Sequence, residues 1–121
     1  MKRQQAVNLY GHLSRMQSAP MKPEPLKAFW LMRLKLRPIF VEYEKVHTEI
    51  NEATKPADWK PGDDQTAWKE AYNLLMNAWL DEEIPDIETN ILTQDDFNDA
   101  VSTTVTSLGV LDYLFENLVK R

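Results

Sequence analysis

The strongest pattern in the chain is an apolar stripe that recurs at alternating steps of three and four residues between positions 29 and 50. Its members are Phe29, Met32, Leu36, Ile39, Tyr43, Val46 and Ile50. This spacing places the side chains on one face of an α-helix. Pro25 suits the first turn of such a helix, because a backbone N–H is not needed there. The pattern therefore predicts a long amphipathic helix that begins near Glu24.

Pro38 lies in the middle of this stripe. A proline inside a helix has no N–H to donate to the carbonyl of residue 34, and its ring collides with that carbonyl. The stripe nevertheless keeps its phase on both sides of Pro38. The sequence therefore favours one helix with a kink at Pro38 over two separate helices.

Two further helical patterns flank this long helix. The first runs from about Gln4 to Gln17, where Leu9, Leu13 and Met16 share a face, and the prolines that follow end it. A loop rich in proline and polar residues, 53–64, precedes the other pattern, which predicts a helix from about Gln65 to Glu82. Its expected buried face consists of Trp68, Tyr72, Leu75 and Trp79.

The C-terminal third predicts short elements. Positions 87–91 alternate between apolar and polar residues, which indicates a short extended segment. Thr93 resembles the N-cap of a helix from Gln94 to about Val101, with Leu92 placed to pack on Phe97. Residues 102–106 fit either a short strand or a helix break. Thr106 or Ser107 then caps a last helix whose expected buried face is Leu108, Leu111, Phe115 and Leu118.

These elements predict an all-α fold for residues 1–121, which form a single helical domain. We expect a small helical bundle around one long proline-kinked helix, with a minor extended segment. The chain has 121 residues, of which 43% are hydrophobic, and this is enough for one core. It contains no cysteine, so disulfides, thiol catalysis and cysteine-ligated zinc are excluded.

Charge is divided sharply along the chain. Residues 1–37 carry eight basic side chains and one acidic one, a net charge of +7, whereas residues 38–121 carry six basic and eighteen acidic ones, a net charge of −12. The basic third can pair with the acidic remainder of the same molecule, with a neighbouring molecule, or with a polyanion. Exposed pairs of this kind contribute about 0–1 kcal/mol each.

Four residues are candidates for contact with a partner: Lys27, Arg33, Arg37 and Trp59. Arg33 and Arg37 stack at i, i+4 on the long helix, but its basic side chains as a set point in several directions. That arrangement is unlike the single basic face that nucleic-acid binding requires. Trp59 lies in a polar loop, where it either folds back over the core or anchors a partner.

No catalytic constellation is recognisable. Asp95, Asp96 and Asp99 have a spacing that can chelate magnesium, but a second acidic cluster is missing, and acids in a first helical turn are favourable in themselves. His12 and His47 have no matched partner, and the isolated glycines form no phosphate-binding loop. We therefore expect no enzyme, no cofactor, no metal and no small-molecule substrate.

Several short motifs and their order carry a resemblance to a known family. The motifs are Lys22-Pro23, Lys27-Ala28, Pro38, Tyr43-Glu44, Leu80-Asp81-Glu82-Glu83, Ile87, Ile91 and the run from Leu108 to Leu114. Their arrangement resembles a family of small bacteriophage and prophage proteins of unknown function, over most of the chain. The chain departs from that pattern in having four tryptophans and a longer loop around Trp59. The resemblance implies a phage structural or assembly accessory protein.

The sequence as a whole thus predicts a non-enzymatic, phage-derived structural or assembly accessory protein that acts through protein–protein interaction. The expected partner is another protein or a second copy in a homo-oligomer. The alternative is a nucleic-acid-associated regulatory protein that uses the basic N-terminal third. No stretch approaches the length of a membrane span and no signal peptide is recognisable, so we expect a cytoplasmic location in the host cell, or association with the virion.

Overall fold

The longest element of the structure is α2 (Pro23–Thr54), against which α1, α3 and α4 all pack. The computed structural model describes residues 1–16, 22–101 and 107–120. The other helices are α1 (Arg3–Met16), α3 (Thr66–Leu80), α4 (Gln94–Val101) and α5 (Leu108–Leu118). Helices hold 73% of these residues, and only isolated β-bridges occur among them. The all-α prediction is therefore confirmed.

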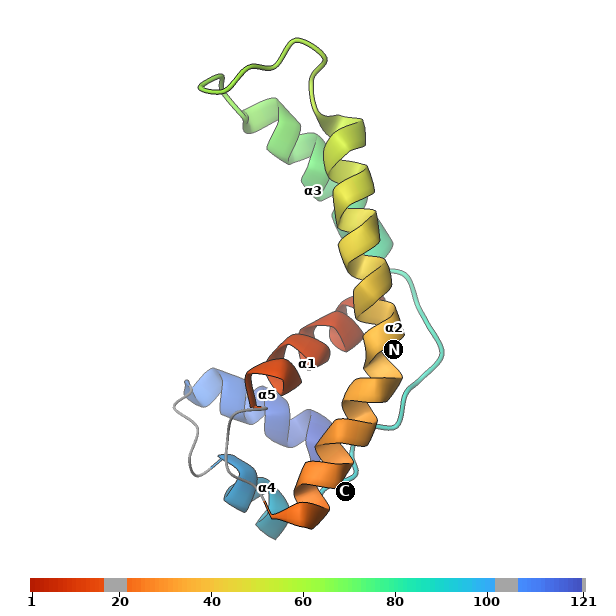
Figure 1. Cartoon of the computed structure of the whole chain (residues 1–121), viewed down its shortest axis with the longest axis vertical. Coiled ribbons are helices and arrows are strands. Elements are labelled where there is room, and N and C mark those ends of the chain that lie inside the picture. Colours follow the sequence, from red (N-terminus) through yellow and green to blue (C-terminus); the bar gives the residue numbers. More distant parts are fainter. Residues whose placement is uncertain (17–21, 102–106, 121) are drawn as a thin grey trace.

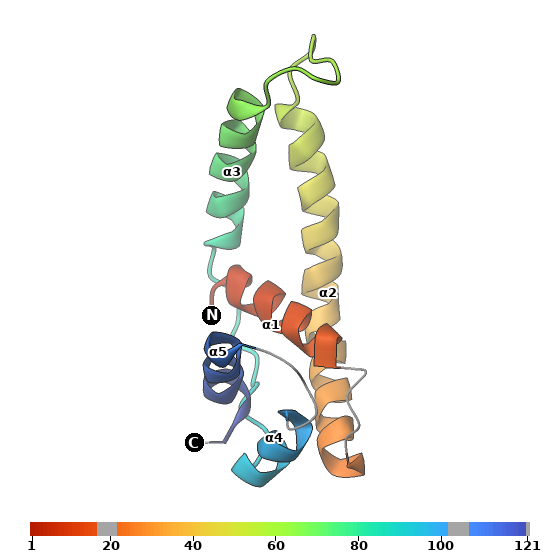
Figure 2. The ribbon, with the colours of Figure 1, turned by 90° about the vertical axis from the view of Figure 1, so that its left-hand side faces the viewer.

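The helices form two parts, a base and a hairpin (Figures 1 and 2). The base consists of α1, α4, α5 and the first half of α2. The hairpin consists of the second half of α2, the connection 55–65 and α3, and it projects from the base as two antiparallel helices. Because α2 belongs to both parts, this one continuous helix connects the base to the hairpin.

The hydrophobic core lies in the base. Its buried members are Ala6, Leu9, Leu13, Met16, Phe29, Met32, Leu36, Leu92, Phe97, Ala100, Leu114, Leu118 and Val119. The first half of the predicted α2 stripe is thus fully buried. The second half, from Ile39 to Ile50, is only partly buried, because in the hairpin it faces the single helix α3. The stripe therefore sets the inward side of α2 along its whole length.

Local capping chemistry fixes the start of the two short helices. The Thr93 hydroxyl accepts a hydrogen bond from the Asp96 N–H at 3.1 Å, and α4 then covers the predicted residues. The Ser107 hydroxyl accepts from the Val110 N–H at 3.3 Å and caps α5, so Ser107 is the cap residue. Residues 102–106, for which strand and helix break were both open, lie outside the described residues.

Pro38 lies inside α2, which continues unbroken from Pro23 to Thr54. The prediction of one helix across this proline is confirmed. Its side chain is exposed, on the side of α2 away from the core. The bend that we expect at this position stays a prediction.

Two predicted buried faces were partly wrong. Leu75 is 49% exposed, because α3 is covered on one side only and Met76 is its buried residue. On α5, Leu108 and Phe115 are exposed, whereas Leu114 and Leu118 are buried. Because α5 carries apolar residues on more than one side, helical spacing alone does not determine which side is buried. In the structure the side with Leu114 packs against α1 and α4. The segment 87–91 contains no strand, although Thr89 within it is buried.

Candidate functional site

Part of the basic N-terminal third is paired within the molecule. The pairs are Lys2–Asp81, Arg3–Glu82 and Lys22–Asp99, with nitrogen–oxygen distances of 2.7, 2.7 and 2.8 Å. The pKa of the Lys2 amine is raised by its hydrogen bond and charge interaction with Asp81, and Asp99 raises that of Lys22 in the same way. Pairing between the two differently charged regions of one molecule is therefore confirmed for these three side chains.

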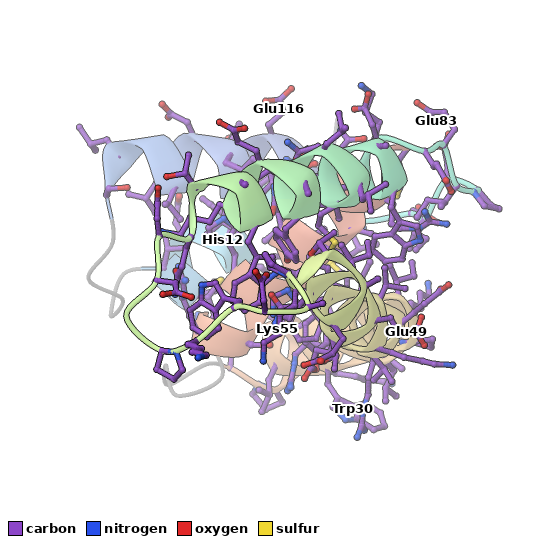
Figure 3. All side chains as sticks on the ribbon, turned by 90° about the horizontal axis from the view of Figure 1, so that it is seen from above. His12, Trp30, Glu49, Lys55, Glu83 and Glu116 are labelled. Carbon is purple, nitrogen blue, oxygen red and sulfur yellow. The ribbon has the colours of Figure 1, made fainter. Side chains whose placement is uncertain are left out.

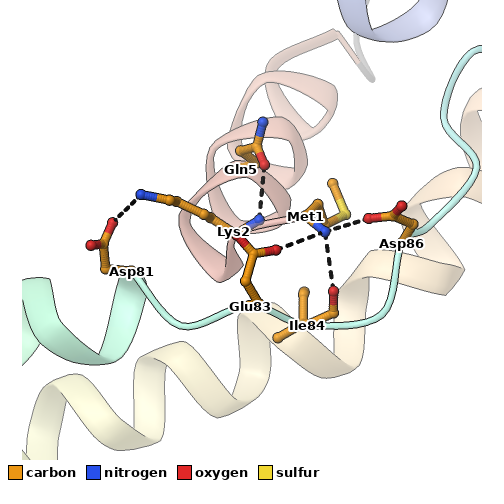
Figure 4. Close-up of polar contacts among 7 residues, drawn as sticks. All are labelled: Met1, Lys2, Gln5, Asp81, Glu83, Ile84 and Asp86. Atoms are coloured by element: carbon orange, nitrogen blue, oxygen red, sulfur yellow. Dashed lines mark hydrogen bonds and ion pairs between the residues drawn. The ribbon is translucent and has the colours of Figure 1, made fainter.

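The chain start lies against the segment that follows α3 (Figure 4). The amino group of Met1 donates to the Ile84 carbonyl at 3.1 Å, pairs with Glu83 at 3.3 Å and contacts the Asp86 carboxylate. The Ile84 N–H donates to the Met1 carbonyl at 2.8 Å. These contacts attach the end of the hairpin to the base. The carboxylates of Glu83 and Asp86 therefore have a structural role.

The basic side chains of α2 behave differently. Four of them lie in its first half, namely Lys27, Arg33, Lys35 and Arg37. None forms an ion pair with a carboxylate among residues 1–16, 22–101 and 107–120. Beyond Arg37 the charge of α2 reverses, with four glutamates and one lysine up to Thr54. Uncompensated positive charge is thus concentrated on the part of α2 that lies in the base.

An apolar ridge runs beside these cations. Leu26, Trp30 and Leu34 follow one another at steps of four residues and are 48%, 55% and 44% exposed. Because helical positions four residues apart share a face, these side chains form one exposed ridge on α2, offset from its core stripe. Trp30 projects outward from the molecule beyond α2 (Figure 3). We name the outer face of α2 by its five members, Leu26, Trp30, Arg33, Leu34 and Arg37.

A shallow pocket of about 70 Å³ opens on the outer face of α2. It is lined by Tyr10, Trp30, Arg33, Leu34 and Arg37. Tyr10 comes from α1 and reaches this place because α1 packs along α2, where its ring stacks on Phe40 with 4.5 Å between centroids. The pocket therefore combines two guanidinium groups with aromatic walls, and its volume suits a group of a few heavy atoms.

Arg33 is held against the wall of this pocket. Its guanidinium carbon lies 5.7 Å from the centroid of the Tyr10 ring, a cation–π contact. Its Nε atom is buried and has no hydrogen-bond acceptor among the residues the structure describes. A buried donor without an acceptor costs about 1–3 kcal/mol, so this arrangement of the Arg33 side chain is unfavourable in itself.

Trp59, the fourth candidate, lies at the tip of the hairpin, far along α2 from the outer face. Its ring meets the Trp68 ring edge-to-face at 5.0 Å between centroids, and the Lys55 amine lies over it at 5.6 Å. It thus folds back onto its own hairpin and not onto the core. The structure brings Arg33 and Arg37 together, sets Lys27 nearly two turns before Arg33 on α2, and leaves Trp59 apart from all three.

Aromatic rings fill the seam between α2 and α3. Tyr43 stacks on Trp79 at 6.4 Å between centroids, and the His47 ring meets Tyr72, whose hydroxyl contacts its Nδ1. A second pocket lies at this seam, lined by His47, Asn51, Gln65, Trp68, Lys69 and Tyr72. These rings account for the pairing of the two hairpin helices in the absence of a broad aliphatic core.

The acidic motif at the start of α4 does not form a metal centre in the structure. Asp95 and Asp96 lie in the first turn of α4, where the helix dipole favours them, and Asp99 pairs with Lys22. Across the described ranges, no group of three or more histidine, cysteine or acidic side chains is arranged to hold a metal ion. Among the helices described, none is long and apolar enough to span a membrane.

Sequence reasoning missed three members of the outer face of α2, Leu26, Trp30 and Leu34, and the part played by Tyr10. The two leucines carry a signal in the sequence, because with Trp30 they form a second apolar row on α2, offset from the core stripe. Tyr10 carries no such signal. Its place beside Arg33 depends on how α1 packs on α2.

Comparison with known proteins adds no relative: no family model matches the chain, and no curated protein and no solved structure is significantly similar to it.

Proposed function

We propose that this protein is a non-enzymatic interaction protein, a phage-derived structural or assembly accessory, whose docking site is the outer face of α2. The observation that carries the proposal is the pairing of an exposed apolar ridge with cations that have no carboxylate partner. Exposed aromatic and arginine side chains that lie together are typical of the centre of protein interfaces. The fold suits such a role, because α2 holds its outer face rigid while its inward side is fixed in the core.

The outer face of α2 fits a protein better than a nucleic acid. A nucleic-acid site needs basic side chains that converge on one surface, whereas Lys35 lies on a different side of α2 from Arg33 and Arg37. The same helix continues into a segment with four glutamates, which would repel a phosphate backbone that followed α2. The ridge of Leu26, Trp30 and Leu34 offers apolar burial instead.

The proposal is tested by binding to defined candidate partners. The purified protein is titrated calorimetrically with the products of the genes that flank its own, head and tail proteins among them. We expect one of them to bind, and we expect the double variant Trp30→Ala/Leu34→Ala to weaken binding at least tenfold, since each is a large exposed side chain at the centre of the face. Higher salt should weaken binding as well, because the cations take part.

Leu74→Ala is the control, because Leu74 is a leucine like Leu34 and is 74% exposed but lies on α3. It should bind like the parent protein. Equal losses in the two variants, or binding that neither variant affects, would contradict docking at the outer face of α2. Binding of duplex DNA at near-physiological salt, abolished by changing Arg33 and Arg37, would instead support the regulatory alternative.

The assembly role makes a separate prediction about location. We expect an antibody against the protein to detect it in the host cytoplasm while particles assemble, and in purified virions if the accessory is retained. A protein that is absent from phage-producing cells throughout assembly would contradict this role, whatever the outer face of α2 binds in vitro.

A further inference from the structure

We infer that the pocket between Arg33 and Arg37 is a carboxylate-binding site, and that the occupant of the outer face of α2 is an acidic amphipathic helix of a partner protein. This inference rests on the proposed docking function and adds the chemistry of the partner. It follows from the state of Arg33, the spacing of the two arginines, the shape of the ridge and the failure of a second copy to fit.

Arg33 is the anchor of the site. The Tyr10 ring holds its guanidinium in place, and the buried Nε donor has no acceptor. A carboxylate accepts two parallel hydrogen bonds from one edge of a guanidinium, and the guanidinium of Arg33 forms no ion pair with a carboxylate of the described residues. Because the side chain is already positioned, less conformational entropy is lost when an acceptor binds.

Arg37 strengthens the preference for an anion. It lies one turn beyond Arg33 on the same face and lines the same pocket. Like charges at i, i+4 destabilise a helix, and no carboxylate of the described residues pairs with Arg33 or Arg37. An anion between the two guanidinium groups removes the repulsion. A partner that covers the exposed Trp30 and Leu34 walls would exclude water from this place and so strengthen the interaction.

The ridge specifies the shape of the occupant. Leu26, Trp30 and Leu34 span eight residues, or about 12 Å along α2, as a straight row with gaps between neighbours. Such a row fits into the groove between the side-chain rows of another helix. A partner helix with an apolar stripe along this row would carry its acidic residues beside the stripe, within reach of Arg33 and Arg37.

A second copy of this chain fits the surface poorly. In a twofold dimer the same patch meets itself, so contact between two ridges brings the Arg33 and Arg37 pairs of both copies together. Shifting the register until these arginines meet glutamates of the second half of α2 places the ridge against that predominantly polar half. Neither register satisfies both the apolar and the charged groups, whereas an acidic amphipathic helix satisfies both.

The test uses two synthetic helical peptides, each about 18 residues long so that a helix can form. One has a leucine stripe flanked by glutamates, and the other has glutamine in place of every glutamate. We expect the glutamate peptide to bind at least tenfold more tightly, because charge-assisted hydrogen bonds to arginine are the stronger kind. In ¹H–¹⁵N spectra the Arg33 Nε–H signal, assigned from its absence in Arg33→Lys, should shift downfield with the glutamate peptide alone.

The variant Arg33→Gln should reduce the preference for the glutamate peptide to less than threefold. The preference of Arg33→Lys for the glutamate peptide should lie between that of the parent protein and that of Arg33→Gln, because lysine keeps the charge but lacks the planar guanidinium. The matched control is Lys60→Gln, which removes the same charge from an exposed position in the hairpin connection and should leave both affinities unchanged. Circular dichroism of each variant verifies that the helices persist.

Several results would overturn the inference. If the two peptides bind equally and Trp30→Ala/Leu34→Ala binds neither, there is no carboxylate site. The docking function of the outer face of α2 would then still hold. Binding of neither peptide, or binding that the ridge variant does not affect, would eliminate the acidic helix as occupant. A dimer in light scattering that Arg33→Gln dissociates would assign the face to a second copy.

Discussion

The guanidinium group of Arg3 lies over the indole ring of Trp79, with 4.3 Å between its central carbon and the ring centroid. The same group donates a hydrogen bond to the Trp79 carbonyl at 2.7 Å and pairs with Glu82. Arg3 is the first residue of α1 and Trp79 lies in the last turn of α3. One side chain thus joins the hairpin to the base by three different interactions.

Replacing Arg3 with alanine should therefore destabilise the protein. The loss combines a charged hydrogen bond to a carbonyl, an ion pair and a cation–π contact, and we expect the free energy of unfolding to fall by about 2 kcal/mol. Urea denaturation followed by circular dichroism measures this change. Lys2→Ala is the control, because the Lys2–Asp81 pair is exposed on both sides, and it should leave the urea midpoint unchanged. Equal effects in the two variants would show that the contact with Trp79 contributes nothing.

The two leucines Leu108 and Leu114 of α5 should respond very differently to truncation. Leu114 is 2% exposed and Leu108 is 80% exposed, although helical spacing assigned Leu108, and not Leu114, to the buried face. Leu114→Ala removes core contacts and leaves a cavity, so we expect a loss of about 2–5 kcal/mol. Leu108→Ala should change the free energy of unfolding by less than about 0.5 kcal/mol. A large loss for Leu108 alone would mean that α5 presents its other face to the core.

Sequence patterns located the helices well because the signals that begin and end them are local. Thr93 and Ser107 cap α4 and α5 through hydroxyls that need only the next three residues. The core stripe of α2 kept its phase across Pro38, and the helix is continuous there. In each case the deciding contacts lie within one turn of the chain, where spacing in the sequence is spacing in the structure.

The buried faces and the candidate site were less accessible to the sequence. Helical spacing assigned Leu75 and Leu108 to the inside, but which face of an apolar helix is covered depends on neighbours that are distant in the chain. The sequence shows that Arg33 and Arg37 are four residues apart and share a helix face, but it does not show the pocket beside them. The pocket needs Tyr10, 23 positions before Arg33, and only the packing of α1 on α2 brings them together.

Pro38→Ala should fold and should be more stable than the parent chain. Alanine restores the N–H that the Leu34 carbonyl lacks and removes the clash of the ring, which together cost on the order of 3 kcal/mol in a helix interior. If the bend expected at Pro38 is needed for α2 to pack against α3, part of this gain in stability is lost. Pro25→Ala is the opposite case, because Pro25 is buried in the first turn, where an N–H is not needed, so truncation only removes contacts. Thermal unfolding of both variants decides the point, and a destabilised Pro38→Ala would show that the helix depends on its proline.

His12 should make the stability of the base depend on pH. Burial lowers the pKa of its imidazole, the charge of Arg15 lowers it further, and its ring lies 5.2 Å from that of Tyr113. In the unfolded chain the group has the ordinary pKa of about 6.5, so between that value and the lower folded value the unfolded state binds more protons. The free energy of unfolding should therefore fall as the pH decreases through this window and should not change through His12 above it. Urea titrations at a series of pH values measure the slope, which His12→Gln should reduce. An unchanged slope in His12→Gln would show that this histidine is as accessible to protons in the folded protein as in the unfolded chain.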